Sequence, residues 1–377
     1  MSRRAWAIVA STLAFGGTAG AQPIKIADVV ELSGVGASNG NNWKDAVELA
    51  FAKINAKGGI LGRKIELTHY DTQTNPGVSR AQVQKALDGE PYVILGPIYS
   101  GSVKVNMGLA QQAGVPQIVG AQAADLTQMG NPFLFRANIG QQAGMPKIAN
   151  YIRDEIKAKT VAVVWVNNDF GKGGRDGFTR EAAGRGIRIV ADLSIENAQV
   201  DFTADVLKVK GAGAEAVFVY LNTEESARFL REAHKQSLNV PLVGETTLLN
   251  QTVIELAGPA ANGVRGHISL SADAPVPEVQ ALKERFHKRY GYVPDHNAVA
   301  GYIAAYTVKA VTEKIGRFDR KAFAEALHGL TITPAQEPGI LMEASWDKNG
   351  DVDRASFLGE VIDGKLRITR ILPKLGN

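Results

Sequence analysis

The segment VILGPIYSGS, residues 93–102, decides how this chain folds. Its first three residues are apolar and favour β-structure, so they predict a short, fully buried strand. A stretch with helical periodicity follows over residues 102–113, and Ser100 stands where a hydroxyl can cap such a helix. A strand that runs into a helix N-terminus is the repeating unit of a parallel sheet with crossover helices. The segment therefore predicts an α/β fold.

The same alternation extends in both directions and occurs twice along the chain. In the first part, strands are predicted at 24–30, 64–70, 93–95 and 117–119, and helices at 42–55, 78–87 and 102–113. After Ile139, strands are predicted at 161–166, 187–193, 216–220 and 241–243, and helices at 173–183, 203–210, 223–236, 276–290 and 297–315. We therefore predict two doubly wound, Rossmann-like α/β units connected by short crossovers rather than by one flexible linker.

The N-terminus has the pattern of a secretory signal peptide. Arg3 and Arg4 form a charged n-region, Ala5 to Phe15 is apolar, and Ala19-Gly20-Ala21 is a small-residue cleavage site. We therefore expect the mature protein in the periplasm of a Gram-negative cell. The paired arginines leave two export routes open, the general secretory pathway and the twin-arginine pathway.

Composition and charge exclude several classes of protein. Of the 377 residues, 45% are hydrophobic and 21% are charged, which is typical of a globular chain with sizeable cores. The formal net charge of +4 becomes +2 when the two arginines of the leader are removed, and this is too small to favour nucleic acid or a membrane surface. No later segment reaches the roughly 18 apolar residues of a membrane span. With no cysteine, disulfides, thiolate metal sites and a lipidated cysteine are excluded.

Five stretches in order resemble the periplasmic leucine/isoleucine/valine-binding protein family, the type I solute-binding proteins of ABC importers. They are INAKGGILGR (54–63), Asp71, GPIYSGS (96–102), NDFG (168–171) and WDKNGD (346–351). The resemblance implies a Venus-flytrap architecture, with two lobes joined by three crossovers and a ligand cleft between them. With the signal peptide at 1–21, it implies that the first lobe is 22–138 plus 272–345 and the second lobe 139–271 plus 346–377.

In the first lobe, four residues are candidates for ligand contact because the carboxyl ends of strands and nearby helix N-termini form the natural binding crevice. The hydroxyl of Ser100 and the N–H groups of the helix after it suit a carboxylate, with a plain N-cap as the alternative. Ala121 and Gln122 follow the fourth strand, where the family presents a small residue and a Ser or Thr to the ligand. Gln122 departs from that pattern, and a solvent-facing loop residue is its alternative. Asn39 is a candidate at the cleft mouth, or a turn or cap residue.

In the second lobe, Phe170 stands where many relatives have tyrosine, and an aromatic ring there would close over the ligand; core packing is the alternative. Asn222 replaces another common aromatic and is either a hydrogen-bond partner or a turn residue. Amino-acid binders of the family place an acid near Glu245 and Thr246 to neutralise the ligand's ammonium. Our register puts Thr246 at that position, with Glu245 one residue earlier.

This register bears on the class of ligand. An ammonium buried without a counter-charge costs several kcal/mol, so we expect a small carboxylate without one, an aromatic or a 2-oxo acid. A shift of one residue would restore the acid. A branched-chain or other aliphatic amino acid is therefore the alternative ligand.

The motifs of enzymes and cofactor sites are weak or missing. The six histidines show neither an H-E-x-x-H pair nor metal-like spacing, and no G-x-S-x-G elbow or Walker-type phosphate loop occurs. GVGASN (34–39) resembles a dinucleotide fingerprint, but Asn39 takes the place of the third glycine. DKNGD (347–351) begins like an EF-hand loop, but Val352 takes the glycine position, which favours a hairpin turn at 349–350. We predict no enzymatic activity, no cofactor and no metal site.

The predicted function is that of the solute-binding component of an ABC importer, a monomer that closes about a hinge on a small-molecule carboxylate. The implied partners are the permease and ATPase subunits at the inner membrane, and no nucleic acid. The basic helical run from Lys283 to Arg289 is either a solvated face or a docking surface for the permease. An extracytoplasmic sensor subunit with the same fold and an enzyme on a doubly wound scaffold are the alternative functions.

Overall fold

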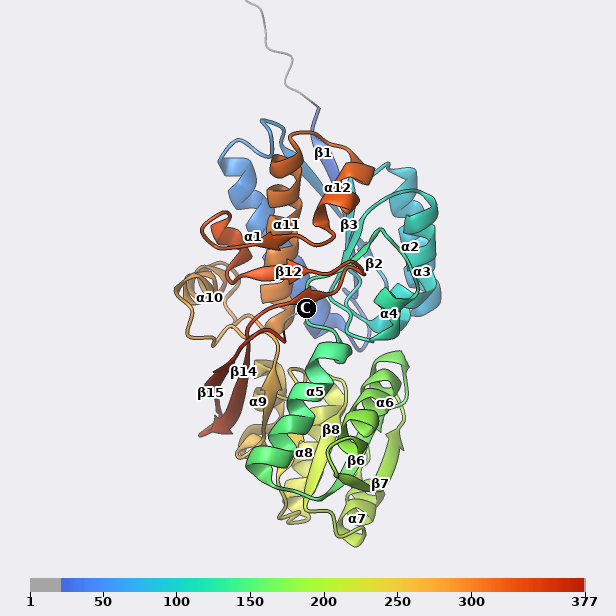
Figure 1. The fold of residues 1–377 in the computed structure, drawn as a ribbon, viewed down its shortest axis with the longest axis vertical. Coiled ribbons are helices and arrows are strands. Elements are labelled where there is room, and N and C mark those ends of the chain that lie inside the picture. Colours follow the sequence, from blue (N-terminus) through green and yellow to red (C-terminus); the bar gives the residue numbers. More distant parts are fainter. Residues whose placement is uncertain (1–21, 376–377) are drawn as a thin grey trace, which may run out of the picture.

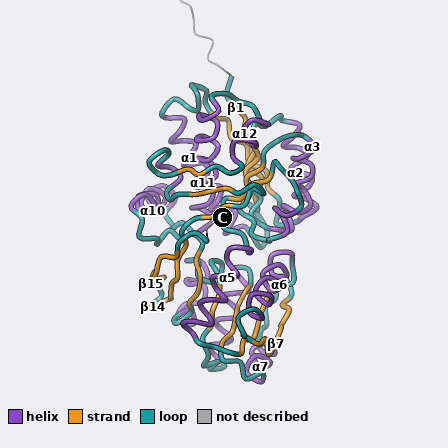
Figure 2. The backbone as a smooth tube through the Cα atoms, in the orientation of Figure 1, coloured by secondary structure: helices purple, strands orange, loops and turns teal. Residues whose placement is uncertain are grey.

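The computed structural model describes residues 22–375, and the predicted signal peptide, 1–21, lies outside the described residues. Two lobes lie end to end, each built around its own sheet (Figure 1). Figure 2 shows strands inside each lobe and helices around them. The predicted α/β class with two doubly wound lobes is confirmed. None of the helices in residues 22–375 combines the length and apolar character that a bilayer crossing requires.

The sheet of the first lobe has five strands in the order β2-β1-β3-β4-β5, and each neighbouring pair is parallel. Strands β3 and β4 are fully buried, as expected for a parallel sheet covered on both faces. The strands are β1 (Ile24–Val30), β2 (Ile65–Asp71), β3 (Val93–Leu95), β4 (Gln117–Val119) and β5 (Leu134–Arg136). The helices are α1 (Ala37–Ala56), α2 (Pro76–Asp88), α3 (Ser100–Gln112), α4 (Asp125–Gln128), α10 (Pro277–Tyr290), α11 (His296–Ile315) and α12 (Arg320–Leu327).

The sheet of the second lobe has seven strands in the order β15-β14-β10-β9-β8-β6-β7. Strands β14 and β15 run antiparallel at one edge, and the remaining pairs are parallel. The strands are β6 (Thr160–Val166), β7 (Arg188–Ile195), β8 (Ala216–Tyr220), β9 (Leu242–Gly244), β10 (Arg265–Ile268), β14 (Ser356–Ile362) and β15 (Lys365–Leu372). The helices are α5 (Gln141–Tyr151) with a π turn (Ile152–Ile156), α6 (Asp169–Ala183), α7 (Thr203–Gly211), α8 (Thr223–Lys235) and α9 (Gln251–Ala257), which a 3-10 turn (Gly258–Ala261) follows.

A small third sheet lies beside one predicted lobe boundary. It consists of β11 (Thr331–Ile332), β12 (Ala344–Trp346) and β13 (Val352–Asp353), with a 3-10 turn at Pro338–Ile340. The Trp346 indole donates to the carbonyl of Arg136 at 2.9 Å, and Asp351 pairs with the Arg136 guanidinium at 2.5 Å. Residues 346–353 are thus bonded to β5 of the first lobe, although the sequence assigned them to the second. We propose that the third crossover lies at 354–355, and the boundaries at 138–139 and 271–272 stay predictions.

The late helix α11 packs along α1 in the first lobe (Figure 1). Trp43 of α1 is fully buried there, and its indole donates to Asp28 of β1 at 2.9 Å. Gly301 of α11 allows the close approach, since a Cβ at this position would lie 2.8 Å from the Trp43 carbonyl oxygen. This packing brings the N-terminus of α11 to the edge of the first lobe that faces the second.

Predicted and observed boundaries differ beside the cleft. Helix α1 begins at Ala37 instead of 42, so Asn39 lies in its first turn, and α3 and α6 begin at Ser100 and Asp169 instead of 102 and 173. Glycines and polar residues fill these first turns, so the apolar periodicity starts later than the helix does. As a result, helix N-termini rather than loops form much of the cleft wall.

Candidate functional site

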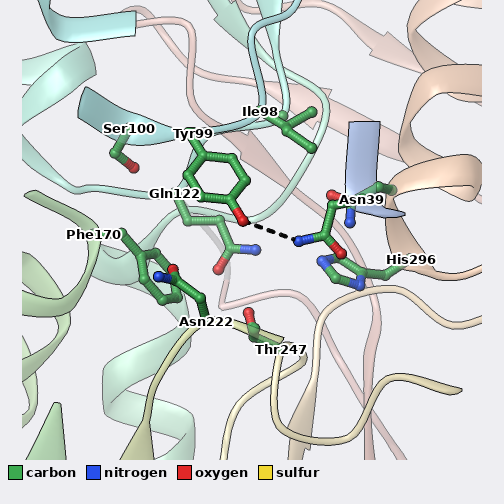
Figure 3. Close-up of a pocket in the computed structure, with 11 residues that line it drawn as sticks. Asn39, Ile98, Tyr99, Ser100, Gln122, Phe170, Asn222, Thr247 and His296 are labelled. Carbon is green, nitrogen blue, oxygen red and sulfur yellow. Dashed lines mark hydrogen bonds between the residues drawn. The ribbon is translucent and has the colours of Figure 1, made fainter. Parts of the chain in front are cut away.

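A cavity lies between the two lobes (Figure 3). The empty space between its lining atoms is ≈ 420 Å³, including the part that is open to solvent at the mouth. Side chains from both lobes form its walls, as in many small-molecule sites that lie between domains. The lining residues are Asn39, Ile98, Tyr99, Ser100, Gly120, Gln122, Phe170, Asn222, Thr247, His296 and Asn297.

Ser100 lines the cavity as the first residue of α3. Tyr99 rather than Ser100 holds the N-cap position, and no side chain caps the helix. The Ser100 hydroxyl accepts a hydrogen bond from the N–H of Ala123 at 3.2 Å, so its own proton is still a donor. A hydroxyl donor beside an uncapped helix N-terminus suits a carboxylate.

Gln122 lines the cavity from the loop after β4, and buried Arg136 positions this loop. The Arg136 guanidinium donates to the carbonyls of Ala121 and Ala123 at 2.6 Å each and pairs with Asp351. Ala121 was predicted to contact the ligand, but it is fully buried and does not line the cavity. Its carbonyl belongs to the network that positions Gln122.

Asn39 connects the two lobes across the cavity. Its amide nitrogen donates to the Tyr99 hydroxyl at 3.4 Å (Figure 3), and its oxygen accepts from the Thr223 hydroxyl of α8 at 3.2 Å. Burial raises the pKa of Tyr99, and the nearby Glu31 carboxyl adds to the rise, so the phenol is protonated and can donate a hydrogen bond. Asn39 therefore holds Tyr99 against the cavity while contacting the second lobe.

Phe170 forms an apolar wall on the second lobe. Its ring stacks on Tyr220 with the centroids 4.3 Å apart and the planes at 21°. The side-chain nitrogen of Gln141 donates both to the Phe170 carbonyl, at 2.8 Å, and to the Tyr220 hydroxyl, at 3.0 Å. A ring held in this way offers a flat apolar face to a ligand.

Asn222 and Thr247 complete the second-lobe wall. Asn222 is the N-cap residue of α8, but its side chain makes no capping bond and instead donates to Asn197 at 3.2 Å. Thr247 lies in the turn after β9, and its carbonyl accepts from the Asn250 amide at 2.9 Å. Both side chains bring neutral hydrogen-bonding groups to the cavity.

Glu245 and Thr246 were predicted to face the ligand, but neither lines the cavity, and Thr247 takes that place. The Glu245 carboxylate is buried and bonds to the Nδ1 atom of His267 on β10 at 2.7 Å. The Thr246 hydroxyl bonds to that of Ser269 at 2.9 Å. The turn after β9 points both side chains toward neighbouring elements, so in either predicted register the acid does not reach the cavity.

His296 and Asn297 reach the cavity from the N-terminus of α11. Asp295 caps this helix by accepting from the N–H groups of Asn297 and Ala298 at 2.8 and 3.1 Å, and it also accepts from the Asn297 amide at 3.1 Å. Burial lowers the pKa of His296, and attraction to Asp295 offsets this only in part. The imidazole is therefore neutral near pH 7.

A buried carboxyl lies behind the cavity wall. Glu31 is fully buried and accepts from the N–H groups of Ile98 at 3.2 Å and Tyr99 at 3.4 Å. Burial raises the pKa of Glu31 to about 7, against the lowering effect of the bonds from Ile98, Ser102 and Tyr99. Since Ile98 and Tyr99 line the cavity, Glu31 is a positioning residue.

Lys104 of α3 links the lobes by two ion pairs. Its ammonium lies 2.8 Å from Asp125 in the first lobe and 2.9 Å from Asp169, the first residue of α6 in the second. Hydrogen bonds to Asp125 and Asp169 raise the pKa of Lys104, so it is charged. The ion pair between Lys104 and Asp169 and the hydrogen bond between Thr223 and Asn39 show that the two lobes are in direct contact.

Sequence reasoning anticipated part of the lining and missed the rest. Among the predicted residues, those at the cavity are Asn39, Ser100, Gln122, Phe170 and Asn222. Ile98 and Tyr99 belong to the segment that predicts the fold, so their nearness to Ser100 was a usable signal. Gly36 of the glycine-rich 34–39 stretch packs against the Tyr99 ring, since a Cβ there would lie 2.8 Å from it. His296 and Asn297 carried no local signal, because they reach the cavity only through the packing of α11 on α1.

The lining combines hydroxyls, amides, two aromatic rings and a neutral imidazole, and no ionised side chain is among the lining residues. Such walls bind a small molecule through hydrogen bonds and flat apolar contact.

Known proteins with similar sequences and structures agree with this description. Residues 23–365 match the model of a family described as "Periplasmic binding protein". The Leu/Ile/Val-binding protein homolog 3 of Brucella melitensis biotype 1 is 30% identical over 368 residues, covering 95% of this chain and 96% of its own. The Leu/Ile/Val-binding protein of Escherichia coli strain K12 is 28% identical over 356 residues, covering 92% of each chain.

Among solved structures, an ABC-transporter solute-binding protein from R. palustris in complex with benzoate superposes with a TM-score of 0.85 at 21% identity, over 94% of this chain and 98% of its own. This likeness shows the fold. The family match, which spans nearly the whole described chain, confirms the resemblance that the sequence predicted. The chain belongs to the periplasmic binding protein family and, within it, to the leucine/isoleucine/valine-binding group of type I solute-binding proteins of ABC transporters.

Proposed function

We propose that this protein is the periplasmic solute-binding component of an ABC importer and that its ligand is a small carboxylate without an ammonium group, an aromatic or 2-oxo acid. The observation that carries this proposal is the absence of a carboxylate among the lining residues, together with the orientation of Glu245 toward His267. An ammonium in this cavity would meet amides, hydroxyls, aromatic rings and a neutral imidazole, and no side chain of opposite charge. Its burial without a counter-charge costs several kcal/mol.

The opposite charge suits the cavity better. A ligand carboxylate can accept from the Ser100 hydroxyl while it lies at the N-terminus of α3, where the helix dipole and free N–H groups favour an anion. Gln122 supplies a further amide donor from the loop after β4. The rings of Tyr99 and Phe170 provide apolar walls for a planar ligand body.

Binding in this proposal proceeds by hinge closure. The lining comes from both lobes, so a ligand that touches Ser100 on one and Phe170 on the other stabilises the closed state according to its preference for that state. A permease and an ATPase at the inner membrane would then recognise the closed monomer and supply the energy of transport. The chain acts in this proposal as a carrier and not as an enzyme.

A branched-chain or other aliphatic amino acid is the second candidate ligand. The observation in its favour is the set of relatives named Leu/Ile/Val-binding proteins, one of them 30% identical over 95% of this chain. A 2-oxo acid and the matching amino acid differ in a single chemical group, since a ketone replaces the ammonium.

This difference gives the test. Thermal unfolding is measured with leucine and with 4-methyl-2-oxopentanoate, which share one side chain, and then with benzoate and phenylpyruvate. A ligand at about a hundred times its Kd stabilises the protein by about 2.7 kcal/mol. We expect stabilisation by at least one acid without an ammonium and none by leucine. Stabilisation by leucine or valine alone would overturn the proposal in favour of the second candidate.

A further inference from the structure

The imidazole of His296 lies in the cavity wall opposite Ser100, and one of its nitrogens has no hydrogen-bond partner in the described part of the chain. His296 is 6% exposed, and its Nδ1 atom is buried with no hydrogen-bond partner among residues 22–375. Figure 3 shows the imidazole extending from α11 toward the cavity beside the Asn39 amide, with Ser100 on the far side. A buried polar atom without a partner is unfavourable unless a bound group pairs with it.

The two amides beside His296 already make hydrogen bonds within the protein. The Asn39 amide donates to Tyr99 and accepts from Thr223. The Asn297 amide donates to Asp295 at 3.1 Å. Of the lining residues, His296 is the one that has a buried side-chain atom without a hydrogen-bond partner within 22–375.

We propose that His296 is a specificity-determining residue that hydrogen-bonds a hydroxyl group on the ligand, remote from its carboxylate. The site would therefore select hydroxylated aromatic acids over unsubstituted ones. This inference rests on the proposed function, since it assumes that the carboxylate is held at the Ser100 end.

The neutral state of His296 decides which ligand group fits. A neutral imidazole donates from one nitrogen and accepts at the other, and the tautomer depends on the partner. A hydroxyl can donate or accept, so it satisfies the unmatched nitrogen in either tautomer. A second carboxylate can only accept, so it would fit only the tautomer that has its proton on the unmatched nitrogen, and the neutral ring would leave its charge without a counter-charge.

The test compares pairs of acids that differ by one hydroxyl. Calorimetric Kd values are measured for 4-hydroxybenzoate against benzoate and for 4-hydroxyphenylpyruvate against phenylpyruvate, because the two lengths sample different distances from Ser100. We expect the wild type to prefer the hydroxylated member of at least one pair by about tenfold, the effect of one buried hydrogen bond. His296→Phe should remove that preference, which is read as the ratio of the two Kd values and therefore does not depend on a change that affects both acids alike. His296→Gln, which can still hydrogen-bond, should keep part of it.

Two controls separate this inference from the proposed function. Ser100→Ala should weaken both members of a pair alike and leave their ratio unchanged. In the wild type, the assigned His296 imidazole 15N resonances should move with the hydroxylated acid and not with the unsubstituted one, a readout that does not depend on how the variants fold.

Each outcome bears on one of the two ideas. A preference that survives in His296→Phe, or no preference in either pair, overturns the role of His296 while the carboxylate proposal stands. If no acid of either pair binds the wild type but 4-methyl-2-oxopentanoate does, the role of His296 fails and the carboxylate proposal stands. If that acid does not bind either, both fail.

Discussion

The Ser100 hydroxyl has two hydrogen-bonding capacities, and the fold uses one of them. Its oxygen accepts from the N–H of Ala123, which ties α3 to the loop that carries Gln122. Its proton is available to a ligand at the same helix N-terminus. One group thus contributes to the cavity wall and to the proposed binding of a carboxylate.

Removal of this hydroxyl should weaken binding. We expect Ser100→Ala to reduce the affinity for the carboxylate found in the thermal screen by about 1 to 3 kcal/mol, because one polar partner is left unmet. The matched control is Ser79→Ala, a buried serine of α2 that bonds to Asn106 away from the cavity, which should lower stability without changing affinity. Unchanged affinity in Ser100→Ala, measured by calorimetry, would remove this residue from the site.

Glu31 makes the stability of the protein depend on pH. Its pKa is raised by burial from 4.5 to about 7, so between these pH values the unfolded carboxyl is ionised and the folded one is protonated. The folded state then binds more protons, and stability falls as pH rises through this window. We expect Glu31→Gln to raise the free energy of unfolding by on the order of 3 kcal/mol at pH 8 and to change it little at pH 4.

A second glutamate provides a control of opposite sign. Burial raises the pKa of Glu48 less than Lys44 and His69 lower it, so its net shift is downward. Glu48→Gln should therefore not stabilise the protein at pH 8. Denaturant titrations of both variants at several pH values test this pair, and a gain for Glu31→Gln that is equal at all pH values would contradict the account.

The contact between α1 and α11 determines where the N-terminus of α11 lies. Gly301 meets the backbone of Trp43 at the centre of this contact, and the same helix begins with His296 and Asn297 at the cavity. Packing between two helices of the first lobe thus places His296 and Asn297 at the cavity, although no motif near the segment 93–102 predicts them. A change in this packing should affect stability first and the cavity second.

Substitutions at two helical glycines test whether stability depends on the packing of α1 against α11. We expect Gly301→Ala to destabilise the protein by about 1 to 3 kcal/mol, because the added methyl would lie 2.8 Å from the Trp43 carbonyl oxygen. Gly108→Ala in α3 is the control, since nothing lies within 4 Å of its Cβ position, and it should stabilise by about 0.5 to 1 kcal/mol. Equal effects of both substitutions in urea unfolding would show that the helices can separate without cost.

The two lobes meet through few direct bonds, so the contacts of a ligand can add a large share of the free energy that favours the closed state. Lys104 pairs with Asp169 across the cavity edge, and Thr223 donates to Asn39 within it. Both contacts join helix N-termini of one lobe to the other. A ligand between these helices adds to them and shifts the population toward the closed state.

The Lys104 ion pairs should therefore contribute to affinity. We expect Lys104→Met to weaken ligand binding by about two- to fivefold at low salt, the range of a partly exposed ion pair, chiefly through faster dissociation. The effect should shrink at about 1 M salt because of screening. Lys321→Met, which removes an exposed pair within α12, has the same charge change and should leave affinity unaltered. If the loss of affinity in Lys104→Met, measured by stopped flow, did not depend on salt, it would contradict an electrostatic contribution of the Lys104 ion pairs.

The α/β class, the two lobes and the helix N-termini at the cleft could all be derived from the order of residues. Apolar periodicity records, element by element, which face of a strand or helix is buried, and this information is local. This periodicity did not identify the antiparallel strands at the edge of the second sheet. Strands β5, β10, β14 and β15 were not predicted, and the pair β14 and β15 extends the second sheet without a crossover helix.

Which side chains meet in the cavity was settled by packing between distant parts of the chain. Thr247 lines the wall instead of Glu245 or Thr246 because one turn after β9 points successive residues to different neighbours. His296 arrives there because α11 packs on α1, more than two hundred residues earlier in the chain. Local sequence encodes burial along each element, whereas the composition of a binding wall depends on long-range contacts that only the folded chain makes.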